Sequence, residues 1–272
     1  MKKVLKKGNL ADVEKKVKEF WETQAKENKT TEFATNPDDN YRTLEINRIG
    51  DDLKDKAIVL DVGCGNGYST LIFAKRFPNM KIVGVDYSPE MIAYANEALD
   101  REPKLKKRVR FVIADVLTLS KDKDLIGKFD FVISERCVIN LLTWTKQRAS
   151  ILEMKKMLKK KGIILLCENT RDGLDRLNSL RKQLGLFAIT VRWHNRYLQE
   201  KELLPFIKKT FKVKAIKNIG SLYYIISRVV YAKFADMEGK QPSYNHPLNA
   251  IAKELPSIGK YSPNYLFVLQ NK

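Results

Sequence analysis

Apolar residues in this chain form two patterns, short continuous runs and longer stretches in which they recur every three or four positions. Continuous runs are typical of strands buried on both faces, and the wider spacing is typical of helices with one buried face. The runs predict strands at 57–62, 81–86, 109–114, 129–134, 163–168, 211–217 and 264–270. The spaced stretches predict helices at 11–28, 42–53, 68–76, 144–159, 171–184 and 198–209, and another that opens at Pro89 behind Ser88 as its cap.

Strands and helices alternate as far as residue 168, after which two helices and two strands follow. Alternation of this kind predicts parallel strands joined by right-handed crossovers. The predicted fold class is therefore α/β, a doubly wound, mostly parallel, seven-stranded sheet. An N-terminal helical segment precedes the sheet, and a helical insertion follows its fifth strand.

The strand at 57–62 leads into a turn with glycine at every second position, Asp61-Val-Gly-Cys-Gly-Asn-Gly67. Glycine lets backbone approach a ligand where any Cβ would clash. The next strand ends on Asp86, and a carboxylate at that place can accept hydrogen bonds from both hydroxyls of a ribose. Together these features predict a nucleoside-binding half of a doubly wound sheet.

The spacing of the glycines excludes two phosphate-binding loops. The dinucleotide pattern G-x-G-x-x-G requires glycine where Tyr68 stands, and no lysine follows as it would in G-x-x-x-x-G-K-[ST]. The order D-x-G-x-G-x-G instead resembles the first motif of the class I S-adenosylmethionine-dependent methyltransferases. The resemblance continues through Asp86-Tyr87-Ser88, Ala114-Asp115-Val116 and the strand at 129–134, in order over roughly residues 40–170.

The resemblance implies a Rossmann-like methyltransferase fold with S-adenosylmethionine as cofactor. It divides one structural domain into an N-terminal helical cap at 1–56, an S-adenosylmethionine-binding core at 57–170, and an acceptor-side insertion with the last sheet strands at 171–272. The strand at 264–270 matches the antiparallel edge strand of the family.

Residues at the carboxyl ends of the strands are expected to hold the donor, since ligands of doubly wound sheets lie there. The turn Gly63-Cys64-Gly65 would lie under the amino-acid tail, and Asp61 would accept from its ammonium. Asp86 would hold the ribose. The alternative for Asp61 is a cap of a helix or turn.

The other donor-site residues are positioned by the resemblance. Tyr87 or Met91 would pack on the adenine, and Asp115 would accept from its amino group, with the Val116 amide nearby. Asp115 has the same capping alternative as Asp61. Two further candidates are Glu135, which would contact the donor or position the acceptor, and Arg42, which would pair with the donor carboxylate unless it is a surface residue.

Methyl transfer by in-line attack depends mainly on alignment, and a general base helps when the acceptor is a hydroxyl or a protonated amine. His194, within Trp193-His194-Asn195-Arg196-Tyr197, is a candidate base, with a structural or orienting role as its alternative. Glu168 at the end of the fifth strand is the second catalytic candidate. His246, between Pro242 and Pro247, is expected in a loop.

The acceptor is constrained only in outline. No Asn/Asp-Pro-Pro-Tyr/Phe motif follows residue 134, which argues against an exocyclic amine of a nucleobase as the methyl acceptor. Several segments of the insertion are similar to a branch of the family loosely associated with cell-surface glycans. Five arginines would suit an anionic acceptor such as a nucleotide sugar, with a solvated helix face as the alternative: Arg171, Arg176, Arg181, Arg192 and Arg196.

The net charge of +19, from 51 basic against 32 acidic residues, is the strongest bias in composition. It is compatible with nucleic acid, an anionic membrane surface or an acidic substrate. Short lysine runs of this kind are also typical of heat-adapted proteins. No aromatic–basic motif for RNA interleaves with them, so nucleic acid is not the favoured partner.

The three cysteines have neither metal-type nor disulfide-type spacing, which predicts reduced thiols in a cytoplasmic protein and no metal. No signal peptide is expected, because no apolar run follows the basic start MKKVLKKGNL. The apolar segment 221–234 has 14 residues with Arg228 in its middle, and it predicts a core helix or a lid over the acceptor. A spanning helix needs about 20 residues. Interfacial attachment to a membrane is the alternative.

Three functions therefore compete. The favoured one is methyl transfer to a small-molecule or glycan-type acceptor. The second is an RNA or protein methyltransferase that uses the basic surface, and the third is a non-catalytic nucleoside-binding protein or an NAD-binding one. The oligomeric state is not predicted.

Overall fold

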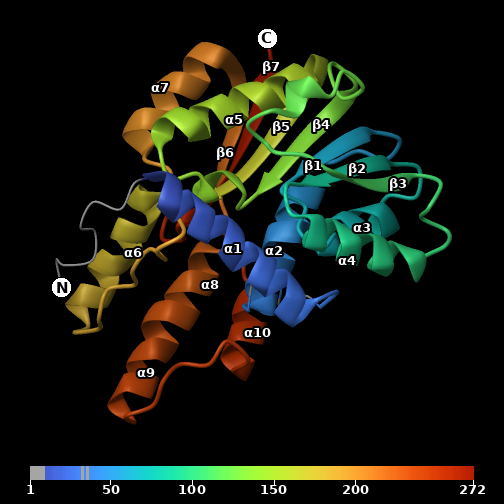
Figure 1. The fold of residues 1–272 in the computed structure, drawn as a ribbon. Coiled ribbons are helices and arrows are strands. Elements are labelled where there is room, and N and C mark those ends of the chain that lie inside the picture. The colour runs from blue at the N-terminus through green and yellow to red at the C-terminus, as the bar shows by residue number, and fades with distance from the viewer. Residues whose placement is uncertain (1–9, 32–33, 35–36) are drawn as a thin grey trace.

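The sheet of this protein, seen in a computed structural model that describes residues 10–31, 34 and 37–272, has the order β3-β2-β1-β4-β5-β7-β6 (Figure 1). Strands β1 to β5 pair in parallel, and β7 runs antiparallel to both of its neighbours. The predicted doubly wound, largely parallel sheet is confirmed. The strands are β1 Ile58–Val62, β2 Lys81–Asp86, β3 Val109–Ile113, β4 Phe129–Glu135, β5 Leu158–Asn169, β6 Phe211–Asn218 and β7 Asn264–Asn271.

The expectation that the last strand forms the edge of the sheet is wrong. Strand β7 lies between β5 and β6, and β6 is the edge. Their burial explains this order, because the first six residues of β7 are all buried, which requires a neighbour on each side. In β6, the exposed residues Lys212, Lys214 and Ile216 alternate with less exposed ones, the pattern of a strand with one solvent-facing surface.

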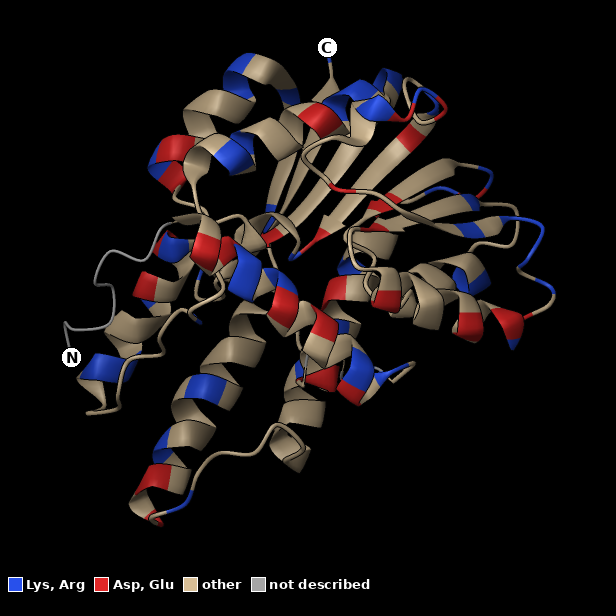
Figure 2. Ribbon diagram, in the orientation of Figure 1, with Lys and Arg blue, Asp and Glu red and all other residues tan. Residues whose placement is uncertain are grey.

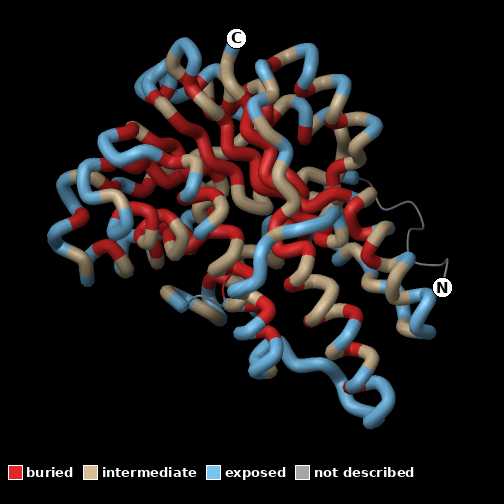
Figure 3. The backbone as a smooth tube through the Cα atoms, turned by 180° about the vertical axis from the view of Figure 1, so that it is seen from behind, coloured by how far each residue is buried: buried red, intermediate tan, exposed pale blue. Residues whose placement is uncertain are grey.

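Successive residues of the central strands enter two separate cores. Val59 and Ile133 face one side of the sheet, which is covered by α2 (Asp39–Gly50), α3 (Tyr68–Arg76) and α4 (Pro89–Asp100). Their neighbours Leu60 and Val132 face the other side, under α5 (Trp144–Met157) and α7 (Glu200–Thr210). Both layers bury the backbone of the sheet (Figure 3).

The ends of the helices are set by capping side chains rather than by the spacing of apolar residues. Ser88 caps α4 as predicted, since its hydroxyl accepts from the Met91 amide. The helix predicted at 42–53 begins at Asp39, because Asp38 caps it by accepting from the Tyr41 amide. The proline-rich loop contains an unpredicted helix, α10 (Pro247–Lys253), for which His246 is the cap.

The remaining helices lie beyond the carboxyl ends of the parallel strands (Figure 1). They are α1 (Leu10–Asn28), α6 (Arg171–Gln183), α8 (Ser221–Ile225), a π-helical turn at Ile226–Val230 and α9 (Tyr231–Met237). The segment 221–234 is thus part of a helical arm that projects from the sheet. Within the described ranges, no helix is long and apolar enough to cross a membrane.

Leu165 lies in the middle of β5 with no exposed surface and belongs to the core under α2 to α4. We expect Leu165→Ala to lower the free energy of unfolding by about 2–5 kcal/mol, because a buried leucine leaves a cavity. Urea denaturation measures this as a lower midpoint. Ile113→Ala, at a side chain 55% exposed on the edge strand β3, is the control and should change the free energy by less than about 0.5 kcal/mol. Equal losses in both variants would contradict this account of the core.

Candidate active site

A cavity of about 480 Å³ lies where β1, β2, β4 and β5 end. Helix α1 and the segment between α6 and α7 form its other walls, together with Tyr224 and Arg228 of the helical arm. Most of the predicted site residues line this cavity. They are Asp61, Gly63, Cys64, Gly65, Asp86, Tyr87, Met91, Asp115, Val116, Glu135 and His194.

The glycine turn after β1 has the backbone that only glycine adopts readily. Gly63, Gly65 and Gly67 have φ angles of +73°, +55° and +79°. A Cβ on Gly63 would also lie 2.6 Å from Sγ of Cys137. The turn can therefore present its backbone to the cavity with no side chain in the way.

The Asp86 carboxylate ties this turn to the end of β2. Its Oδ2 accepts from the Gly65 amide at 3.0 Å, and its Oδ1 accepts from the Ser88 amide at 2.9 Å. Both oxygens keep a second lone pair, as the vicinal hydroxyls of a ribose require. Burial raises the pKa of Asp86 to about 6, while the two amides act in the opposite direction.

Asp61 is the second buried acid of the cavity. It accepts a hydrogen bond from the Thr70 hydroxyl of α3. Burial raises the pKa of Asp61 to about 7, and the nearby Glu135 and Asp86 add to the rise. These three acidic side chains lie close enough to interact with one another, and such a group favours a cationic ligand, such as the ammonium and sulfonium of S-adenosylmethionine.

The predicted adenine contacts surround the ends of β2 and β3. Met91 is buried, and the Tyr87 hydroxyl is buried without a hydrogen-bond partner among the described residues. Asp115 accepts from the Leu117 amide with Oδ1, and its Oδ2 lies 3.9 Å from Lys18 Nζ of α1. Asp115 thus stabilises its own turn, as the capping alternative expected, and also lines the cavity.

The structure does not bring Arg42 into the cavity. This side chain is 1% exposed and lies over the Tyr68 ring, 5.0 Å from its centroid. Both the pairing with the donor carboxylate and the surface alternative are therefore unsupported. Arg42 instead lies on the side of α2 that packs on Tyr68 of α3.

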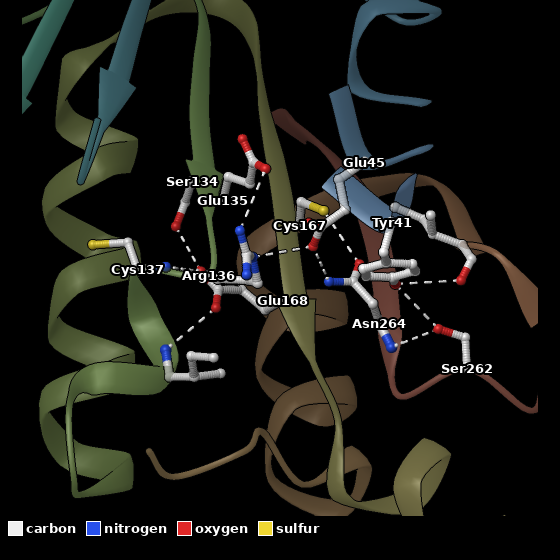
Figure 4. Close-up of polar contacts among 12 residues, drawn as sticks. Tyr41, Glu45, Ser134, Glu135, Arg136, Cys137, Cys167, Glu168, Ser262 and Asn264 are labelled. Atoms are coloured by element: carbon white, nitrogen blue, oxygen red, sulfur yellow. Dashed lines mark hydrogen bonds and ion pairs between the residues drawn. The ribbon is translucent and has the colours of Figure 1, made fainter. Parts of the chain in front are cut away.

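Glu168 also does not line the cavity and is fully buried. Its contacts with Ser134 and the loop after β4 are drawn in Figure 4. Its Oε1 accepts from the Ser134 hydroxyl at 2.7 Å and from the Val138 amide at 2.9 Å, and its Oε2 accepts from the Ile139 amide at 3.3 Å. The Cys137 amide is a further donor at 3.1 Å. With four donors around it, Glu168 anchors the loop after β4, and the structure does not support it as a catalytic base.

Arg136, which sequence reasoning missed, lines the cavity just after β4. Figure 4 shows its guanidinium between Glu45 and Glu135. Its Nε lies 3.2 Å from Oε1 of the buried Glu45, which also accepts from Asn264 Nδ2, and its guanidinium lies 3.9 Å from Glu135. Arg136 has a φ of +54°. No sequence signal marked it, because its buried partner Glu45 comes from α2, far away in the chain.

His194 lines the cavity against aromatic residues of α1. Its ring stacks on Phe20 at 4.4 Å and meets the edge of Trp21 at 5.5 Å. Burial lowers the pKa of His194 to about 4, with a smaller contribution from Arg192. The imidazole is therefore neutral at physiological pH, and its basicity is low.

Four of the five arginines expected at the acceptor mouth are bound within the protein. Arg171 pairs with Asp175, Arg176 with Glu200, and Arg196 with Glu202. Arg181 donates to the Phe187 carbonyl. Arg192 alone of the five lines the cavity, and it makes no ion pair with a described residue.

Helix α1 forms the roof of the cavity through Glu14, Val17, Lys18 and Trp21. The Trp21 indole donates to Asn140 Oδ1 at 3.2 Å, and Glu14 pairs with Lys146 at 2.6 Å. The apolar spacing predicted this helix, but not its place over the cavity. Nothing in the described ranges forms a cluster of side chains that would hold a metal ion.

Comparison with known proteins agrees with this geometry. A family model described as a methyltransferase domain matches residues 53–229. The chain is 29% identical over 160 residues to an uncharacterised protein of Rickettsia prowazekii, covering 57% of this chain and 60% of that protein. It is 24% identical over 191 residues to the malonyl-acyl-carrier-protein O-methyltransferase of Priestia megaterium, covering 66% of this chain and 65% of that enzyme.

Among solved structures, magnesium protoporphyrin IX methyltransferase from Synechocystis with bound S-adenosylhomocysteine has a TM-score of 0.60 at 14% identity, covering 97% of this chain and 100% of that one. At such identity the likeness concerns the fold. The match to the family model covers more than half of the chain, so this protein belongs to the class I S-adenosylmethionine-dependent methyltransferase family. It spans 60% and 65% of the length of the two curated relatives.

We expect Asp86→Asn to raise the dissociation constant of S-adenosylhomocysteine about 10–100-fold, because a charged acceptor of two hydroxyls is lost. Calorimetry measures this, with the exposed Asp100→Asn as the control.

In the wild type, the affinity for adenosine should fall about tenfold from pH 8 to pH 5, since the Asp86 carboxyl is protonated as the pH falls through its pKa of about 6. Adenosine lacks the tail that would face Asp61. An affinity independent of pH would contradict the assignment of the ribose to Asp86.

Glu168→Gln should lower the free energy of unfolding by about 1–3 kcal/mol, because the new amide group faces donors that it cannot satisfy. The affinity for S-adenosylhomocysteine should stay within about threefold of the wild type, since Glu168 does not line the cavity. Chemical denaturation and calorimetry test the two statements, with Glu97→Gln on the surface of α4 as the stability control. A variant of wild-type stability that has lost turnover would restore Glu168 as a catalytic base.

Proposed function

We propose that this protein transfers a methyl group from S-adenosylmethionine to a small-molecule acceptor. The observation that carries the proposal is that one cavity joins Asp86 and the glycine turn to Asn169, His194 and Arg192. A donor held at the first group of residues would thus have open space between its tail and the second group. Alignment of two reactants in one enclosed site is what this reaction chiefly requires.

Each side of the cavity has its own task in this proposal. S-adenosylmethionine supplies a methyl group activated by its sulfonium charge. Asp86 binds the ribose, the glycine turn lies against the tail, and Asp61 accepts from the ammonium. On the opposite side, Trp21 and His194 cover the acceptor and keep bulk water from the reacting atoms.

Proton removal is not assigned to a strong base. A base works best when its pKa lies near the working pH, and the pKa of His194 is lowered to about 4. His194 therefore fits the alternative of orienting the acceptor better than the assignment as a base. An acceptor that is already ionised would need no base, and the relative from Priestia megaterium is named for an O-methyl transfer involving a malonyl group.

The distribution of charge favours a small acceptor over RNA. Lysines and arginines are spread over many elements and are interspersed with acidic residues (Figure 2). Many of the basic side chains form ion pairs, such as Lys75 with Glu102 and Lys217 with Asp52. An RNA-binding face would gather unpaired cations into one patch or groove.

Incubation with methyl-labelled S-adenosylmethionine and a fractionated cell extract tests the proposal. We expect label in the low-molecular-weight or glycan fraction, and no label from Asp86→Ala, which should no longer bind the donor. Asp100→Asn is the matched control and should label as the wild type does. Label confined to RNA or protein would contradict the small acceptor, and calorimetry that detects NAD but not S-adenosylhomocysteine would contradict methyl transfer altogether.

A further inference from the structure

The acceptor side of the cavity carries polar atoms that the protein leaves unsatisfied. Nδ1 of His194, Oδ1 of Asn169 and Oδ1 of Asn195 are buried and have no hydrogen-bond partner among the described residues. All three residues line the cavity. His194 and Asn169 are only 3% and 8% exposed, so the surrounding solvent does not reach them freely.

These side chains are held in place by their surroundings. The His194 ring is stacked on Phe20, which fixes that side chain. The backbone of Asn169 is fixed by the Leu198 amide, which donates to its carbonyl at 3.0 Å. Buried polar groups in proteins are rarely left unsatisfied, because each one disfavours the folded state. Three of them, in residues that line one cavity, indicate a ligand that supplies hydrogen-bond donors.

The nature of the unsatisfied atoms narrows the ligand. An amide oxygen only accepts, and a neutral imidazole accepts with one of its nitrogens. Hydroxyls and amines are the common donors in small molecules. The guanidinium of Arg192 lies close enough to lower the pKa of His194, and it has no carboxylate partner in the described part of the chain. A positive charge beside the subsite disfavours a protonated amine and favours a ligand with a negative group.

Resting on the proposed methyl transfer, we propose that the acceptor is a small hydroxylated anion. Its hydroxyls donate to His194, Asn169 and Asn195, and its negative group faces Arg192. The rings of Trp21 and Tyr224 supply the apolar walls of the same space. The four polar residues act as specificity determinants, and none of them takes part in bond making.

Three six-carbon probes separate the components of this recognition in protein saturated with S-adenosylhomocysteine. Gluconate has hydroxyls and a carboxylate, sorbitol has hydroxyls alone, and hexanoate has a carboxylate alone. Ligand-observed NMR titration should show gluconate binding at least about tenfold more tightly than either of the others, the effect expected for one lost charge-assisted or several neutral hydrogen bonds. No detectable binding of gluconate, or equal binding of hexanoate, would overturn the inference.

Variants assign the effect to the named side chains. His194→Phe keeps the stacking on Phe20 and removes the ring nitrogens, and Asn195→Leu removes an amide acceptor. Each variant should lower the affinity for gluconate about tenfold and leave the affinity for hexanoate unchanged. Arg192→Gln should lower the affinity for gluconate and leave the affinity for sorbitol unchanged. Its control is Arg110→Gln, at an exposed position of β3. Unchanged gluconate affinity in all three variants would overturn the inference.

Binding of S-adenosylhomocysteine, measured on the same variants, distinguishes failure of this inference from failure of the proposed function. Calorimetry with S-adenosylhomocysteine should give the wild-type affinity in every acceptor-side variant, because Asp86 and the glycine turn are intact. If the protein binds S-adenosylhomocysteine but binds gluconate and hexanoate equally, only the inference of a hydroxylated anion is wrong. If the wild type does not bind S-adenosylhomocysteine, both the inference and the proposed function are wrong, since the inference depends on the proposed function.

Discussion

The hydrogen bonds of the Asp86 carboxylate to the amides of Gly65 and Ser88 are the constraint on which the donor side of this protein depends. One side chain joins the end of β2, the glycine turn after β1 and the start of α4. The left-handed glycines allow the turn to reach Asp86 at all. A carboxylate fixed in this way needs little reorganisation to bind a ribose, and its partial desolvation strengthens each hydrogen bond that it makes.

A second buried carboxylate has the corresponding role on the acceptor side, although it never reaches the cavity. Glu168 fixes the loop after β4 through the amides of Val138 and Ile139. The next residue of that loop, Asn140, accepts from Trp21, and Trp21 lies against His194. The roof over the acceptor is therefore positioned by a chain of contacts that starts at the end of β5. Two acids that both lie at the carboxyl ends of strands thus have different surroundings: Asp86 lines the cavity, and Glu168 supports a loop.

The sequence was sufficient to predict those features that depend on residues close together in the chain. The glycine turn, the Ser88 cap and the carboxyl ends of the strands depend on neighbours within a few residues. The turn and the cap lie where they were predicted, and each carboxyl end lies within one residue of its predicted place, although β5 starts five residues earlier than predicted. Arg42 was assigned to the donor, Glu168 to catalysis and the five arginines to the acceptor, but Arg42, Glu168 and four of the arginines have other partners within the protein. Arg136 was missed for the same reason, because Glu45 comes from a helix that precedes the sheet. The place of β7 inside the sheet is visible only when its unbroken burial is compared with the alternation in β6.

The central claim is that one cavity holds the donor at its strand ends and leaves the acceptor wall free. A crystal structure of the protein with S-adenosylhomocysteine tests it most directly. We predict the ribose hydroxyls on Asp86, the tail over the glycine turn, and open space between the sulfur and His194. A ligand bound elsewhere, or a ligand whose tail fills the space beside Asn169 and Arg192, would contradict the account.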